Sequence, residues 1–170
     1  KHYLRTVKDP FRREAIGAWH TSHMTQVHVD RGTTSQVRLH GELAMQAFET
    51  VESCSSIAYA RNNLGYLALL SRNLELATEQ FYSVADTDRH ATLVYNLAVL
   101  SACKGDLPLA LEYCNETRGL LEGGRNEFML CCLLWEKGEV REELHPSISV
   151  PLTVFLDRLE TAVKNALVET

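Results

Sequence analysis

In the middle of the chain, apolar residues recur every three or four positions, which is the spacing that places them on one face of an α-helix. The first series of this kind stops at Arg72 and Asn73, and asparagine is a favoured N-cap residue, so a second helix is predicted to start there. The stretch therefore predicts two helices joined by a tight turn. Their predicted buried faces carry Ala60, Leu64, Leu67, Ala68 and Ser71, and then Leu74, Ala77, Phe81 and Val84.

The same pattern returns 33 residues later with different residues. A period between 20 and 50 residues is the sequence signature of a repeat array. In this second copy the turn is KGD, Asp106 is the predicted N-cap of the following helix, and Pro108 falls in its first turn, where a missing N–H is harmless. The matching pairs are Leu64 with Leu97, Gly65 with Ala98, Ala77 with Ala110 and Phe81 with Cys114.

Small residues occupy equivalent places in both copies. Gly65 lies on a predicted first helix and Ala77 on the second helix, where small side chains allow the two backbones to approach closely. Glycine inside a helix costs about 1 kcal/mol relative to alanine. Its presence at Gly65 indicates that close contact matters more there than helix propensity.

These stretches resemble the tetratricopeptide repeat (TPR) family, whose unit has about 34 residues. The matching segments are NLGYLAL with LELATEQF and NLAVLSA with LPLALEYC. Arg61 and Val94 fill the position where the family has a tryptophan, Val84 and Thr117 fill its late alanine, and its linking proline is absent. The resemblance implies an all-α fold, a TPR-like α-solenoid of antiparallel helix pairs.

Extending the period in both directions predicts two outer repeats. Forward, Leu130 and Gly138 align with Leu97 and Gly105, so EFMLCCLLWEKGE is predicted as a third first helix, with Leu130 buried. Backward, GELAMQAFETVES is predicted as a second helix, but its first helix would cover VDRGTTSQ, which is polar and broken by glycine. The repeats are predicted to span residues 34–142, with degenerate outer units, because terminal repeats present one face to water.

The flanks form three further predicted segments. Residues 1–33 are predicted as an N-terminal helical segment and loop, and residues 143–150 as a loop. Residues 151–170 carry a strongly amphipathic helix with Leu152, Phe155 and Leu159 on its apolar stripe. This helix is predicted to cap the core, and the alternative is a dimerisation or interdomain helix.

Composition and charge exclude several classes of partner. The chain is 45% hydrophobic and 23% charged, which is typical of a globular protein. A net charge of -5 gives no basic footprint for nucleic acid or for an anionic membrane. No apolar run reaches the roughly 18 residues that a membrane span needs, and the first residues lack the apolar region of a signal peptide. We expect a cytoplasmic piece of a larger protein.

The sequence offers no set of residues for catalysis or for a cofactor. The five cysteines have no paired spacing and are predicted to be buried, reduced thiols. His20, His23 and His28 cluster, yet no ligand set beyond Asp30 accompanies them, so packed or solvated histidines are favoured over a metal site. No phosphate-binding loop or nucleophile motif is present. We therefore expect no enzyme, no metal and no cofactor.

Two asparagines carry the functional hypothesis. Asn63 and Asn96 directly precede the two Leu-small pairs, one repeat apart. The TPR resemblance implies that an asparagine at this place binds the backbone of an extended peptide in the concave groove, and a carboxamide can donate and accept at once. The partner is then a protein or peptide segment. The predicted peptide-binding residues are Asn63, Asn96, Tyr59, Asn62, Tyr66, Tyr95, Arg125 and Phe128.

An alternative function is a structural or regulatory helical-repeat domain. Its concave face would be filled by its own chain, by a neighbouring domain or by a second copy, as in the helical repeats of signalling NTPases. Self-association through the C-terminal helix belongs to this alternative. A chain segment lying across the concave face would favour it over an open peptide groove.

Overall fold

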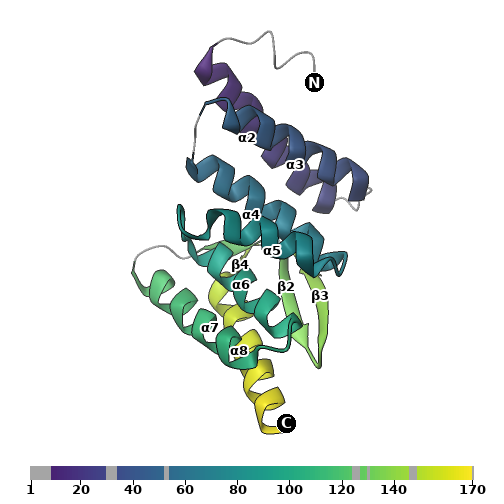
Figure 1. The fold of residues 1–170 in the computed structure, drawn as a ribbon, viewed down its shortest axis with the longest axis vertical. Helices are drawn as coiled ribbons and strands as arrows, with labels where there is room; N and C mark the ends of the chain where they lie inside the picture. Colours follow the sequence, from purple (N-terminus) through teal and green to yellow (C-terminus); the bar gives the residue numbers. More distant parts are fainter. Residues whose placement is uncertain are drawn as a thin grey trace.

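Seven α-helices and two small antiparallel sheets make up the described part of the computed structural model (Figure 1). The structure describes residues 9–29, 34–51, 54–123, 127–129, 131–145 and 149–169. The helices are α2 (Pro10–Val29), α3 (Thr34–Glu49), α4 (Cys54–Leu70), α5 (Leu74–Ala85), α6 (Ala91–Cys103), α7 (Leu107–Glu122) and α8 (Leu152–Glu169). The strands are β1 (Phe128–Met129), β2 (Cys131–Glu136), β3 (Glu139–Leu144) and β4 (Val150–Pro151).

Consecutive helices pack against each other in pairs, α2 with α3, α4 with α5, and α6 with α7. The pairs follow one another along the molecule from the purple N-terminal end to the green region in Figure 1. The mostly helical fold and the pairing of adjacent helices confirm the coarser part of the fold prediction. The sheets were not predicted, and the TPR-like arrangement of the pairs stays a prediction.

Two glycines let the helices of a pair approach closely. A Cβ atom added to Gly65 on α4 would lie 2.4 Å from Cε1 of Phe81 on α5. A Cβ atom on Gly17 of α2 would lie 2.5 Å from Cε1 of Phe48 on α3. Both phenylalanine rings are buried, so in the first two helix pairs a ring packs directly against the backbone at a glycine.

The position of Gly17 corrects the prediction for the first pair. The strict period placed the missing first helix on VDRGTTSQ, but Val29 ends α2 and Thr34 begins α3. Gly17 precedes Gly65 by 48 positions instead of 33, because α2, α3 and α4 run for 20, 16 and 17 residues, whereas α5 and α6 have 12 and 13. The predicted second helix is α3, and its Ala44 and Phe48 are buried as expected.

The predicted turns and caps of the two central pairs are confirmed. The side chain of Asn73 accepts a hydrogen bond from the backbone N–H of Leu76 at 3.0 Å, and that of Asp106 accepts one from Leu109 at 3.2 Å. Each cap satisfies a backbone donor that the first helical turn leaves without a partner. Gly105 has a φ of +81°, a conformation that favours glycine.

The predicted third first helix is wrong, because residues 131–144 form a β-hairpin. Strands β2 and β3 pair antiparallel around Lys137 and Gly138, whose φ angles of 53° and 82° are those of a type I′ turn. Four consecutive residues of β2, from Cys132 to Trp135, are buried. A short apolar run buried on both faces has no period that separates strand from helix, so the alignment with α6 misled the prediction. Leu130 lies outside the described residues.

The C-terminal helix α8 packs on α7 and on β2. Its buried residues are Leu152, Phe155, Leu156, Leu159 and Val163, which confirms that its apolar stripe covers the core. Arg118 of α7 adds ion pairs to Asp157 at 2.9 Å and to Glu160 at 2.6 Å. Most of the stripe is therefore used inside the chain.

We expect Gly65→Ala to lower the free energy of unfolding by about 1–3 kcal/mol, because the new methyl group overpacks against the ring of Phe81. Urea unfolding followed by circular dichroism measures the change. Gly119→Ala on α7 is the matched control, since no atom lies within 4 Å of its added Cβ. That control should raise stability by up to about 1 kcal/mol. Equal effects of the two substitutions would contradict the close-contact interpretation.

Candidate functional site

The face of α4 and α6 that was predicted to bind a peptide is covered by the β2–β3 hairpin. We call this surface, which carries Asn62, Tyr66, Tyr95 and Asn96, the inner face. The hydroxyl of Tyr66 donates to Oε1 of Glu142 on β3 at 2.5 Å, and that of Tyr95 donates to the backbone carbonyl of Leu133 on β2 at 2.5 Å. The two tyrosines thus attach successive first helices to the chain's own hairpin.

Burial keeps both tyrosines in the neutral, hydrogen-donating form. Removal from water raises the pKa of Tyr66 well above its ordinary value, and the neighbouring Cys131 and Glu142 raise it further. Burial also raises the pKa of Tyr95, with Cys132 adding to the effect. Because Leu133 belongs to a two-stranded sheet, its edge carbonyl needs a partner outside the sheet, and Tyr95 supplies it.

The asparagines pair with each other inside the protein. Nδ2 of Asn96 donates to Oδ1 of Asn62 at 2.9 Å, and the two side chains are only 2% and 3% exposed. The peptide-binding hypothesis needs the side chain of Asn96 to be open to a ligand, and in the structure it is buried. All residues from Leu93 to Ala102 are buried, since α6 is packed against α5, α7, α8 and the hairpin. Asn63, which follows Asn62 directly in the sequence, is half-buried.

The remaining predicted peptide-binding residues lie apart from this pair. Tyr59 is 49% exposed, and its ring centroid lies 4.5 Å from that of His90. Phe128 belongs to β1, where its backbone is opposite Pro151 of β4. Arg125 lies outside the described residues. The structure thus joins Asn62, Tyr66, Tyr95 and Asn96 through contacts within the chain, and a role of the eight residues in peptide binding stays a prediction.

The start of α6 is occupied by a carboxylate of the same chain. The backbone N–H and the hydroxyl of Thr92 both donate to Oε2 of Glu127, and the carbonyl of Glu127 accepts from the N–H of Leu152 at 2.8 Å. A carboxylate at a helix N-terminus is stabilised by the free N–H groups and by the helix dipole. Glu127 therefore connects the beginnings of α6 and α8 and fills the anion-binding end of α6.

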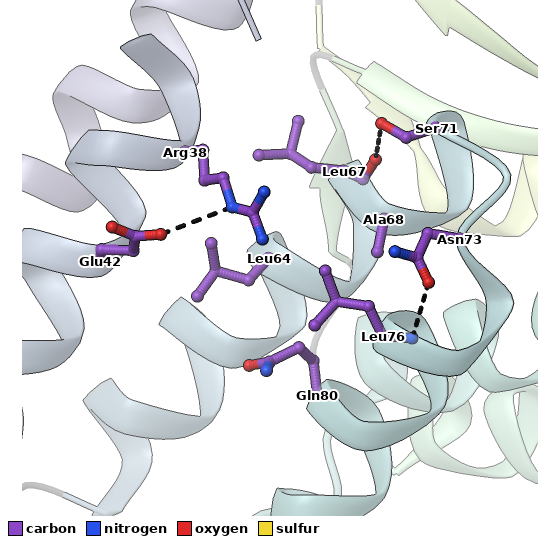
Figure 2. A pocket seen from close by; sticks show the side chains of 9 residues that line it. All are labelled: Arg38, Glu42, Leu64, Leu67, Ala68, Ser71, Asn73, Leu76 and Gln80. Carbon is purple, nitrogen blue, oxygen red and sulfur yellow. Dashed lines mark hydrogen bonds and ion pairs between the residues drawn. The ribbon is translucent and has the colours of Figure 1, made fainter. Parts of the chain in front are cut away.

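Sequence reasoning missed a cleft between the first and second helix pairs, which we call the α3–α4–α5 cleft (Figure 2). Its volume is about 190 Å³. Arg38 and Glu42 project from α3 over one side and form an ion pair of 3.4 Å between Nε and Oε1. The lining residues are Arg38, Glu42, Leu64, Leu67, Ala68, Ser71, Asn73, Leu76 and Gln80.

The cleft explains why one predicted core residue remains accessible. Leu64 was expected to be buried with Ala77 and Phe81, but it is only half-buried and lines the cleft. Its spacing to Leu67 and Ala68 is that of an ordinary buried helix face, so the sequence pattern carries no signal of the gap. The gap arises because α3 packs on α4 but leaves the space next to Leu76 and Gln80 of α5 unfilled.

A second hollow lies between the turn of the hairpin and the end of α8. It measures about 500 Å³ and is bordered by charged side chains of both signs. Arg158 holds this region together through ion pairs to Glu143 at 2.8 Å and to Glu136 at 3.7 Å. Ala162 and Ala166 are its only apolar lining residues, so it offers little surface for an apolar ligand.

A metal centre needs several His, Cys, Asp or Glu side chains that face one another. No group of three or more such side chains among the described residues is arranged to hold a metal ion. Cys103, Cys114, Cys131 and Cys132 are free thiols; Cys114 and Cys132 are buried as predicted, whereas Cys103 and Cys131 are only partly buried. Burial raises the pKa of Cys103 to about 11 and that of Cys114 to about 12, which disfavours the reactive thiolate.

Comparison with known proteins gives no identification, since the chain matches no family model, no curated protein sequence and no solved structure. Within the part of the chain that the structure describes, none of the helices has the length and apolar character to cross a membrane.

We expect Asn96→Ala to lower the free energy of unfolding by about 1–3 kcal/mol, because it leaves the buried Oδ1 of Asn62 without its donor. Asn63→Ala is the matched control on the adjacent position, and we expect a change within about 0.5 kcal/mol. Chemical denaturation measures both. Similar stabilities of the two variants would contradict the internal role of Asn96.

Proposed function

We propose that the chain is a protein–protein interaction module of TPR-like helix pairs, whose inner face is closed by its own hairpin and whose partner binds in the α3–α4–α5 cleft. The observation that carries the proposal is the contrast between these two surfaces. The polar groups of the inner face are hydrogen-bonded within the chain, whereas leucine side chains remain accessible in the cleft.

The inner-face contacts favour a closed helical-repeat domain over an open peptide groove. A peptide bound to Asn96 and Tyr95 would have to replace the contacts to Asn62 and to the carbonyl of Leu133. Each buried partner left without a hydrogen bond costs about 1–3 kcal/mol. Leu133 and Leu134 are also fully buried, so displacing β2 would expose apolar surface as well.

The size and lining of the cleft suit an anchor side chain of a partner protein. Its volume of about 190 Å³ is below the roughly 300–1,000 Å³ of typical small-molecule sites. Leu64, Leu67 and Leu76 form an apolar floor, and polar side chains surround it. An apolar centre inside a polar rim is the usual anatomy of a protein–protein contact, in which one buried side chain contributes most of the affinity.

The rim also indicates the charge of the partner segment. Arg38 and Glu42 are 59% and 61% exposed, and an exposed ion pair of this kind contributes only about 0–1 kcal/mol. Arg38 can therefore exchange Glu42 for a carboxylate of the partner at little cost. The proposed ligand is a segment with one large apolar side chain next to an acidic residue.

Selection of displayed peptides against the wild-type protein tests this function. We expect the selected peptides to bind Arg38→Ala and Leu76→Ala at least tenfold more weakly, which corresponds to about 1.4 kcal/mol. Fluorescence anisotropy with synthetic peptides measures the affinity, and thermal melts confirm that both variants are folded.

Glu79→Ala, which is exposed on α5 outside the cleft, is the matched control and should bind like the wild type. Asn63→Ala and Tyr59→Ala test, in the same assay, the two predicted peptide-binding residues that lie beside the inner face and keep some exposure to water. Peptides that depend on Asn63 and Tyr59 but not on Arg38 and Leu76 would overturn the cleft proposal in favour of the peptide-binding residues predicted from the sequence. Peptides indifferent to all four would overturn both locations.

A further inference from the structure

Three imidazole rings meet where α2 crosses α3. His20 and His23 lie one turn apart on α2, and His40 lies on α3. Nδ1 of His20 and Nδ1 of His40 are 3.0 Å apart, a hydrogen-bond distance. The ring centroid of His40 lies 5.2 Å from that of His20 and 4.7 Å from that of His23.

The contact between His20 and His40 depends on the number of protons that the two rings carry. A hydrogen bond between two ring nitrogens needs one N–H donor and one bare nitrogen, so at least one ring is neutral in this arrangement. When both rings are charged, two N–H groups face each other and the bond is lost. Two positive charges at that distance also repel each other.

Among the described residues, no carboxylate contributes to the pKa shifts of His20 and His40. The titratable groups that influence His20 are His40 and His23, and the one that influences His40 is His23. On α2, Arg13 and Glu14 lie about two helical turns before His20. This spacing is about 9–11 Å along the helix axis, beyond hydrogen-bond reach of the His20 ring, and neither residue contributes to the pKa shift of His20.

The other helices packed here also keep their charges elsewhere. Arg38 and Glu42 flank His40 on α3, but they pair with each other and line the α3–α4–α5 cleft. The charged residue of α4 is Arg61, which pairs with Glu49 at 3.8 Å. When the histidines take up further protons, the added positive charge therefore lies next to other histidines. No anion among the described residues offsets it.

The direction of the pKa shifts agrees with this geometry. Burial lowers the pKa of His20, and the charges of His40 and His23 lower it further. Burial and His23 lower the pKa of His40. Between the lowered values and the ordinary value of about 6.5, the unfolded chain binds more protons than the folded chain, so the stability of this region falls as the pH falls.

We propose that the His20–His40 contact is an acid-sensitive latch, which holds α2 on α3 at neutral pH and releases it when both rings are protonated. The release is local, because α2 packs mainly on α3 and has few contacts with α4. The helices from α4 to α8 share one continuous apolar core in which α2 has no part. Acid therefore opens the first helix pair and leaves the rest of the fold intact.

Hydrogen exchange with mass spectrometry on the whole chain tests the latch. Amide protection is compared at pH 7.5 and pH 5.5, after correction for the pH dependence of intrinsic exchange. We expect protection in α2 and α3 to fall at least tenfold at the lower pH, and protection in α6 and α7 to stay within twofold. Equal protection of α2 at both pH values would overturn the proposal.

The variant His20→Gln/His40→Gln removes the titrating groups while keeping side chains that can hydrogen-bond to each other. Its protection in α2 should no longer depend on pH, whereas His145→Gln, a control whose ring lies beside Phe155 of α8, should behave like the wild type. Acid opening that persists in the double variant with the same midpoint would overturn the latch. If the double variant has no protection in α2 at pH 7.5, His40→Gln alone decides: its opening must shift to lower pH, and an unchanged midpoint overturns the proposal.

Discussion

The close approach of paired helices over a small residue is the constraint on which the rest of the structure depends. With Gly65 facing the ring of Phe81, α5 lies directly on α4, and another side of α4, which carries Tyr66, contacts the hairpin. Ala98 and Cys114 are buried at the equivalent positions of the third pair. A larger residue at these points would rotate or separate the helices, and the first helices would no longer share a face for β2 and β3.

That shared face is polar at its centre although it is buried. Asn62 and Asn96 join α4 to α6, while Tyr66 and Tyr95 join these helices to the hairpin. Apolar contacts alone would tolerate several positions of a short hairpin. Hydrogen bonds with fixed donors and acceptors restrict it to one register, since any slip leaves buried groups without partners. The residues that seemed best suited to a ligand thus select the chain's own partner strand.

The sequence was informative where local chemistry determines the structure. The caps at Asn73 and Asp106, the buried Ala77 and Ala110, and the apolar stripe of α8 follow from short-range spacing and were predictable. The hairpin was not, because CCLLWE has no period that distinguishes a strand buried on both faces from a buried helix. The first pair was misplaced because a fixed period cannot accommodate the longer α2. The cleft beside Leu64 depends on how completely two helix pairs fill the space between them, which the pattern along one chain does not encode.

The hydrogen bonds of Glu127 also imply an order of folding. The contacts inside each helix pair are local, so α4 to α7 can form as soon as those residues are available. The start of α6, however, receives its carboxylate from a residue 35 positions further along, and Glu127 in turn holds the first N–H of α8. Tyr95 likewise reaches its acceptor 38 residues away. During synthesis the central helices must therefore persist with the buried side of α6 open to water, and the last segments of the chain close it. During this interval the apolar surface of α6 is exposed, so chaperone binding and aggregation compete with the completion of folding.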